Sequence, residues 1–250
     1  MLSQGCTGAY AIILSDVPML SQCHPSAFTY TPEQIASVRS LISADRFCCY
    51  LTAAKGDERI AIHRYEHNTA LSESLYGVLQ GFEVALRNSM HDTLIREMDS
   101  LEWYERVGLD ASELESIETA RRKVTTKGKT ATSSRIVAGL TFGFWVSLTA
   151  RRYDAPLWIP HLRKAFPRKN LGRRTAFERL SRIRLLRNSV AHHECILQRD
   201  LAQDYRDIIE ATTWICTDTA TWIRKTTRFE ACYRLLFKTE VIPPTEGTKL

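Results

Sequence analysis

The 250-residue sequence contains no apolar run that approaches the roughly 20 residues of a membrane-spanning helix. Its longer apolar stretches, at residues 11–14 and 139–148, fall well short of that length. It also has no lysine or arginine before Arg39, so the basic segment of a secretory signal is missing. These two absences predict a protein that neither spans a membrane nor carries a secretory signal.

Cysteine pairs that build a disulfide framework or a zinc site are also absent. The seven cysteines are odd in number and scattered, and none stands in a C-x-x-C pair. This pattern argues against a disulfide framework and against a zinc ribbon. Scattered cysteines indicate a reducing compartment, so we expect the protein in the cytoplasm.

The common signatures of metal and cofactor enzymes are missing too. The sequence has no glycine-rich phosphate loop, no nucleophile elbow and no pair of catalytic carboxylates. His63 and His67 have the i, i+4 spacing of a helical metal pair, but the segment between them does not form H-E-x-x-H. We therefore expect no metal and no cofactor.

The composition that remains is that of an ordinary globular protein with helical periodicity. Hydrophobic residues make up 44% of the chain and charged residues 25%, both close to the averages of soluble proteins. No run alternates between apolar and polar residues in the manner of a strand. The sequence predicts an all-α helical bundle, with a single domain at 27–240, an unpatterned N-terminal tail at 1–26 and a C-terminal tail at 241–250.

Apolar residues recur at spacings of three and four along most of the chain, which is the pattern of amphipathic helices. The segment at 61–98 reads as one long helix or as two joined near residues 77–81. Helix-start signals stand at Pro32 and Asp110. The other predicted helices cover residues 32–54, about 110–124, 133–151, 173–193 and 200–237, with a short-helical, proline-rich connector around residues 156–167.

Basic residues are concentrated in two blocks. Residues 163–187 hold ten lysines and arginines against one acidic residue, and residues 121–135 hold six against none. Such blocks are typical of surfaces that bind polyanions, although a solvated helix surface has the same composition. The predicted RNA-binding face comprises Arg173, Arg174, Arg179, Arg182, Arg184, Lys127 and Lys129.

The most unusual stretch of the chain is residues 184–194, at the end of the basic helix. It brings Arg187, Asn188, His192, His193 and Glu194 within eight residues. On an ideal helix Arg187 and His192 differ by about 140° in direction, so only a distorted helix or a second copy of the chain aims both at one point. An arginine can neutralise a phosphate, and a histidine can transfer protons near neutral pH. The alternative is a helix end with polar side chains of no special role.

This stretch resembles the Arg-x4-6-His signature of the HEPN superfamily of α-helical RNases and RNA-binding proteins. The string Leu186 to Glu194 is similar to the abortive-infection (Abi) D/F branch of that superfamily. Several other segments agree with this branch in order, and the resemblance extends from about Pro32 to Trp222. The segments that agree with this branch are Tyr65 to Asn68, Leu75-Tyr76, Phe82 to Asn88, Trp103-Tyr104, Phe142 to Trp145, and Trp158.

The resemblance implies a HEPN-like helical bundle and a homodimer in which the two motifs face each other. It further implies metal-independent cleavage of RNA by attack of a ribose 2′-OH, in a toxin or an antiviral effector. An antitoxin or a noncoding RNA is then expected as a regulator. Arg187 and His192 would be catalytic, and Asn188 would orient them or the phosphate.

Four further residues are supporting candidates: His193, Glu194, Arg87 and Asn88. The dipeptide Arg87-Asn88 repeats Arg187-Asn188, but segment 83–88 is better explained as a buried ion pair or packing element that supports the catalytic helix. Two rival functions stay open. One is a non-catalytic RNA-binding module of the same fold, which holds a structured or noncoding RNA, and the other is a protein-interaction scaffold.

Overall fold

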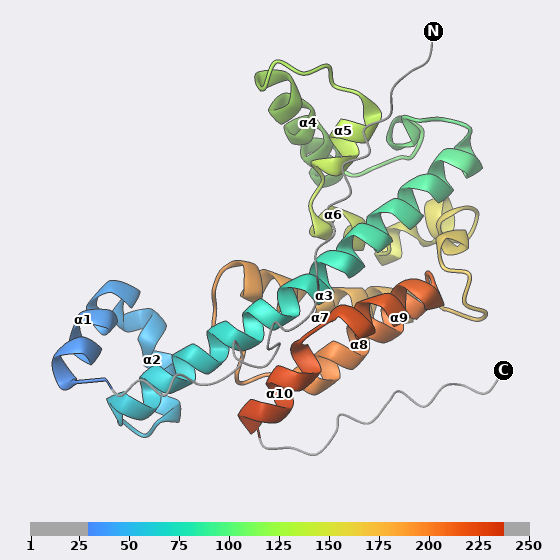
Figure 1. Ribbon diagram of the computed structural model, residues 1–250. Helices are drawn as coiled ribbons and strands as arrows, with labels where there is room; N and C mark the ends of the chain where they lie inside the picture. Colours follow the sequence, from blue (N-terminus) through green and yellow to red (C-terminus); the bar gives the residue numbers. More distant parts are fainter. Residues whose placement is uncertain (1–29, 238–250) are drawn as a thin grey trace, which may run out of the picture.

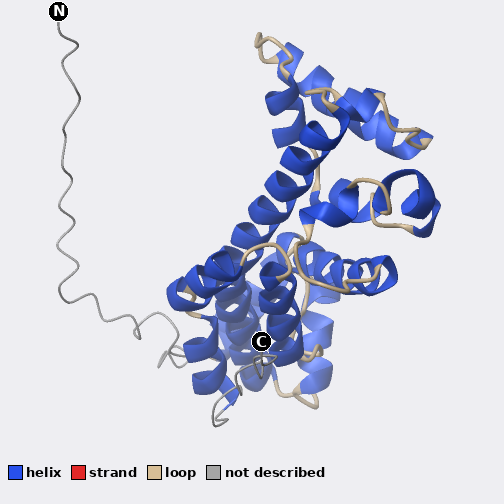
Figure 2. Cartoon of the chain, turned by 90° about the vertical axis from the view of Figure 1, so that its right-hand side faces the viewer, coloured by secondary structure: helices blue, strands red, loops and turns tan. Residues whose placement is uncertain are grey.

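The computed structural model describes residues 30–237, and every regular element within that range is a helix. The all-α prediction is confirmed, as Figure 2 shows for the whole described chain. No helix of this range is both long and apolar enough to cross a bilayer. The predicted tails at 1–26 and 241–250 lie outside the described residues.

Two short helices form the N-terminal end: α1 (Pro32–Ile42) and α2 (Ala44–Ala53). A capping box begins α1, because Thr31 Oγ1 accepts a hydrogen bond from the Gln34 backbone N–H and the Gln34 side chain accepts one from the Thr31 N–H. The prediction of one continuous helix over 32–54 is wrong. Ser43 has φ 78°, outside the helical region, and its side chain caps α2.

The longest element is α3 (Glu58–Met98), a single helix of 41 residues. It continues through residues 77–81, which settles the choice between one helix and two. Asp57 caps its start by accepting from the backbone N–H groups of Arg59 and Ile60, and Asp99 ends it in the left-handed conformation. At 1.5 Å per residue, α3 is about 60 Å long. It crosses the molecule, with α1 and α2 at its N-terminal end (Figure 1).

The middle of the chain consists of short helices. Residues 133–151 do not form the one helix that we predict. They divide into α5 and α6 around Gly139, and Thr141 caps α6 by accepting from the Phe144 N–H. The proline-rich connector is short-helical, as predicted. In chain order the elements are η1 (Trp103–Glu105), α4 (Ala111–Thr126), α5 (Ser133–Ala138), α6 (Phe142–Ser147), η2 (Arg151–Tyr153), η3 (Asp154–Trp158) and η4 (Leu162–Ala165).

The C-terminal part is α7 (Arg173–Ala191), α8 (Leu201–Thr213), α9 (Thr217–Thr226) and α10 (Phe229–Phe237). The single helix predicted for 200–237 is therefore wrong. The backbone is extended at Cys216 and at Thr227, which divides the segment into three. All four helices contact α3, and Figure 1 shows α8, α9 and α10 beside its middle.

Two separate groups of buried side chains hold these helices together. The larger is built around α3 from Leu71 onward and includes Phe142, Phe144 and Trp145, so these three rings are core residues and not an exposed surface for stacking on bases. The smaller joins α1, α2 and the first turns of α3 through Ile35, Phe47, Tyr50, Ala54, Ala61 and Ile62. Because α3 contributes to both groups, it links the N-terminal helices to the rest of the described residues.

Candidate active site

Helix α7 ends inside the Arg-x4-His sequence. The His193 N–H donates to the Val190 carbonyl (3.2 Å) and the Glu194 N–H to the Ser189 carbonyl (2.9 Å). These two bonds form a Schellman motif, which requires a left-handed residue, and His193 occupies that position with φ 57°. The chain therefore leaves the helix directly after His192, and the geometry of an ideal helix does not apply to the histidines.

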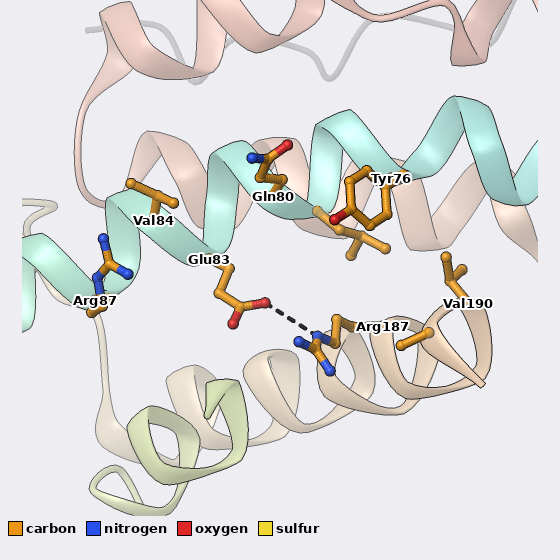
Figure 3. A pocket seen from close by; sticks show the side chains of 9 residues that line it. Tyr76, Gln80, Glu83, Val84, Arg87, Arg187 and Val190 are labelled. Atoms are coloured by element: carbon orange, nitrogen blue, oxygen red, sulfur yellow. Dashed lines mark hydrogen bonds and ion pairs between the residues drawn. The ribbon is translucent and has the colours of Figure 1, made fainter. Parts of the chain in front are cut away.

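Arg187 lies before this end and pairs with Glu83 from the middle of α3. Its Nε donates to Glu83 Oε2 at 3.1 Å, and the two side chains are 35% and 26% exposed. Such a pair orients the guanidinium while leaving it within reach of solvent (Figure 3). Glu83 thus forms an ion pair that supports α7, as predicted for segment 83–88, although the pair is only partly buried.

Arg187 also lines a groove between α3 and α7, which we term the Arg187 groove. Its volume is about 230 Å³, and it is open on one side. Two arginines and one carboxylate stand among aliphatic side chains, so the groove offers positive charge beside apolar surface. The α3 side consists of Tyr76, Leu79, Gln80, Glu83, Val84 and Arg87, and the α7 side of Arg187, Val190 and Ala191.

The other residues of the motif lie outside this groove. Asn188, His192, His193 and Glu194 are all exposed. His192 follows Ala191, the last residue that lines the groove, but does not line it itself. Within one chain the structure thus holds Arg187 in the groove and leaves His192 at its rim, on the exposed helix end.

Asn68 of α3 fixes the segment that follows the motif. Its side-chain amide donates to the Glu194 carbonyl (3.1 Å), and its Oδ1 accepts from the Ile196 N–H (2.8 Å). Asn68 is 4% exposed. Both bonds span more than a hundred residues of sequence, so α3 directly anchors the chain after α7. Our sequence analysis did not identify this role, although a polar residue inside an apolar helical period is the signal for it.

Between those two anchored positions, Cys195 packs beside Cys49 of α2 and the smaller core. Burial, together with a hydrogen bond and the charge of Cys195, raises the pKa of the Cys49 thiol to about 12. Burial likewise raises the pKa of Tyr50. The Cys49 thiol and the Tyr50 hydroxyl therefore stay protonated at neutral pH and add no charge to this contact.

Arg87, a supporting candidate, lies one turn of α3 beyond Glu83 and lines the same groove. Its Nε donates to Asn88 Oδ1 at 3.1 Å, and Asn88 is exposed. Among the described residues no carboxylate pairs with Arg87. The structure therefore brings Arg87 and Arg187 to one groove, while Asn88 lies outside it.

Most arginines of the predicted RNA-binding face already have partners inside the molecule. Arg179 and Arg182 both contact the buried Asp207 of α8, at 2.9 and 3.0 Å, and Arg179 also reaches Glu210 at 2.7 Å. Burial alone would raise the pKa of Glu210, but hydrogen bonds from Arg168 and Arg179 hold it below its ordinary value. The block thus joins α7 to α8.

The remaining arginines of α7 differ in exposure. Arg173 is 13% exposed; it donates to the Thr149 carbonyl and approaches Asp154. Arg184 packs near Gly143 of α6, and its Nε is buried. Arg174 is 85% exposed and pairs only with Glu178, one turn away. Arg174 is therefore the most accessible cation among the five.

Lys127 and Lys129 lie in the exposed loop after α4, far along the sequence from the Arg187 motif. Lys127 lines a shallow hollow of about 580 Å³ together with Arg122 and Lys123. In the described part of the chain neither lysine forms an ion pair. This loop is a cationic surface without internal partners.

Metal ligands do not gather at these positions. Within residues 30–237, no three side chains among His, Cys, Asp and Glu lie close enough to hold a metal ion. His63 instead contacts Glu66 through Nδ1 at 2.9 Å. Burial and the neighbouring His63 lower the pKa of His67.

Comparisons with known proteins do not assign a family. A scan against protein-family models, a search of curated proteins and a search of solved structures each find no match to this chain. The resemblance to the Abi branch of the HEPN superfamily therefore stays a prediction from the motif, and the site is interpreted from its own geometry.

Proposed function

We propose that this chain is a metal-independent endoribonuclease whose catalytic groups are Arg187 and His192. The observation that carries the proposal is the placement of Arg187 in a solvent-open groove, oriented by Glu83 from a different helix. Only its Nε is used in that pair. The terminal nitrogens of such an arginine are suited to two parallel hydrogen bonds with a phosphate.

The chemistry needs a cation and a proton-transfer group and no further cofactor. A ribose 2′-oxygen attacks the adjacent phosphorus, the bond from phosphorus to the 5′-oxygen breaks, and a 2′,3′-cyclic phosphate and a 5′-OH result. Arg187 stabilises the negative charge that develops on the phosphoryl oxygens. His192 transfers the proton between the attacking and leaving oxygens. Glu83 is a positioning residue, since it acts through Arg187.

The proposal places the complete site across a homodimer. His192 lies at the exposed rim in one chain, so a second copy with its α7 end opposed to the first brings His192 of that copy to Arg187. The biological role that fits is a cytoplasmic toxin or antiviral abortive-infection effector, restrained by an antitoxin or a noncoding RNA.

The test is incubation of purified protein with total cellular RNA in excess chelator, followed by mapping of the product ends. We expect Arg187→Ala and His192→Ala each to lower the cleavage rate by about 10²–10⁴-fold, the usual contribution of a proton-transfer or charge-stabilising group. Arg224→Ala is the matched control, because it removes an exposed arginine that lies outside both the groove and the predicted RNA-binding face. Wild-type cleavage by both site variants would refute the proposal.

Mixing the two inactive variants tests the dimer separately. If Arg187 of one subunit works with His192 of the other, a heterodimer of Arg187→Ala and His192→Ala regains one intact site, and partial activity returns. If each subunit uses its own pair, the mixture stays inactive. Equilibration of the subunits is verified with a mass-tagged copy.

A second candidate function is RNA binding without cleavage. The exposed Lys127 and Lys129 favour it, because neither lysine forms an ion pair among the described residues and Lys127 lines a hollow with Arg122 and Lys123. In that case no product ends appear with any protein, and the Arg187 and His192 variants lower RNA affinity instead of a cleavage rate.

A further inference from the structure

One stripe of α3 faces the Arg187 groove with three chemically different side chains. Tyr76, Glu83 and Arg87 stand at positions i, i+7 and i+11, which are two and three helical turns apart and therefore share a face. Opposite them, Arg187, Val190 and Ala191 have the i, i+3, i+4 spacing of one face of α7. The groove is thus a straight channel between two helices, with an aromatic ring at one end.

Tyr76 is the aromatic residue of this channel and is 62% exposed. Figure 3 shows its ring at the end where Val190 stands, with Arg87 at the far end and Arg187 between them. Most aromatic side chains of the described residues are buried in the cores; Tyr76 and Trp222 are more than half exposed, and of these two only Tyr76 lines the groove with the two arginines. An aromatic face of this kind stacks on a nucleobase and tolerates any base.

The charges along the channel favour a polyanion over a neutral peptide. Glu83 neutralises one of the two guanidinium groups, and Arg87 has no carboxylate partner among the described residues. From Tyr76 to Arg87 the helix rises by about 16 Å, a span that suits a base at one end and phosphates further along. The groove volume of about 230 Å³ is below the roughly 300–1,000 Å³ of pockets for drug-sized ligands, which suits one planar base.

We propose that the Arg187 groove binds an unpaired nucleotide of the RNA, with its base stacked on Tyr76 and the following phosphates held by Arg187 and Arg87. This inference rests on the proposed RNA cleavage and assigns its substrate class as single-stranded RNA. A base in a duplex is covered on both faces by its neighbours, so Tyr76 selects loops, bulges and ends.

The test uses a fluorescent 2′-O-methyl oligoadenylate, which lacks the 2′-OH nucleophile and so reports binding alone. We expect the single strand to bind and its duplex to bind more weakly. Tyr76→Leu, which retains apolar area but no aromatic face, is expected to weaken binding by about 5- to 150-fold, the equivalent of the stacking free energy of one base. Tyr76→Phe keeps the ring and should bind within about 2-fold of wild type.

Leu185→Ala is the matched surface control, since Leu185 is 55% exposed on α7 and lies outside the groove. The oligomeric mass of every variant is measured in the same buffer. Wild-type affinity of Tyr76→Leu would overturn the inference. A loss of affinity that occurs only together with a change in mass would also overturn it, because Tyr76 would then bind a second protein chain rather than a base.

The two proposals fail in distinguishable ways. If the oligonucleotide binds through Tyr76 and no RNA is ever cut, the nuclease proposal falls and the stacking site stands. If RNA is cut through Arg187 while Tyr76→Leu binds like wild type, the nuclease stands and the stacking site falls.

Discussion

At the scale of single residues, the backbone explains one of the two adjacent histidines. His193 holds the left-handed position that ends α7, where glycine is the usual residue. His192 precedes it in an ordinary conformation with φ −96°. The two side chains look equivalent in sequence, yet the structure gives only His193 a conformational role. This difference separates a structural histidine from a proposed catalytic one.

His193→Gly should therefore stabilise the protein, by about 0.5–1 kcal/mol, because glycine adopts the left-handed conformation without a steric cost. His192→Gly, the matched control, should not stabilise it, because His192 does not need that conformation. Denaturant midpoints check both. A destabilised His193→Gly protein would show that the imidazole ring contributes more than its backbone conformation costs.

Asn68 is another single residue with a structural role, because it binds backbone groups that lie far away in the sequence. Asn68→Ala removes the partner of the buried Ile196 N–H and should lower the free energy of unfolding by about 1–3 kcal/mol. Asn88→Ala, on the exposed side of the same helix, should change it by no more than about 0.5 kcal/mol. Equal effects of the two variants in denaturant unfolding would contradict the anchoring role.

At the scale of elements, periodicity predicted where helices form better than where they end. The long α3 carries its apolar period without interruption, so its sequence alone indicates a helix. The breaks at Ser43, Gly139 and Cys216 depend on single backbone conformations or on packing against other helices, and the hydrophobic period continues across them. Helix starts and stops of this kind have only weak local signals.

The site shows the same limit. Arg187 and His192 stand in a short motif that the sequence displays directly, whereas Glu83 reaches Arg187 across 104 residues. The composition of the basic block predicts a free cationic face, but two of its partners, Asp207 and Glu210, lie three residues apart on the next helix. Pairing between helices decides which cations remain free, and one segment read alone does not contain that information.

Asp207 tests how firmly α7 is attached to α8. Its carboxylate is 2% exposed and accepts from Arg179, Arg182 and Gln203. Asp207→Ala leaves a partly buried Arg179 with one partner fewer, and we expect a loss of about 3–5 kcal/mol in unfolding free energy. Glu178→Ala breaks a solvent-exposed ion pair within α7 and should leave the denaturation midpoint unchanged. Similar losses from the two variants would contradict this account.

At the scale of the whole molecule, the net charge of +6 does not show where positive charge is available to RNA. Fewer cations are free on α7 than its count of basic residues suggests. Arg179 and Arg182 of α7 are paired with carboxylates of α8, while Lys127 and Lys129 of the loop after α4 form no ion pair among the described residues. RNA affinity, if it follows free charge, should depend on the loop more than on the count of basic residues in each block.

We therefore expect replacement of Lys127 and Lys129 by alanine to weaken RNA binding alike for all sequences. The slope of log affinity against log salt should fall by about 1.4–1.8, since each lost phosphate contact removes about 0.7–0.9. Arg179→Ala should lower stability and leave that slope unchanged, because its charge is already paired with Asp207 and Glu210. A salt slope that the lysine variants do not alter would assign the RNA surface elsewhere.

The length of α3 also has a consequence for synthesis of the chain. This helix is complete at Met98, yet the C-terminal helices that contact it, α7 to α10, begin only at Arg173 and end at Phe237. At about 5–20 residues per second, a ribosome takes on the order of ten seconds to supply them. During that time the apolar face of α3 has only α1, α2 and part of the middle of the chain for cover. The larger core therefore closes only after the residues of α7 to α10 have been made.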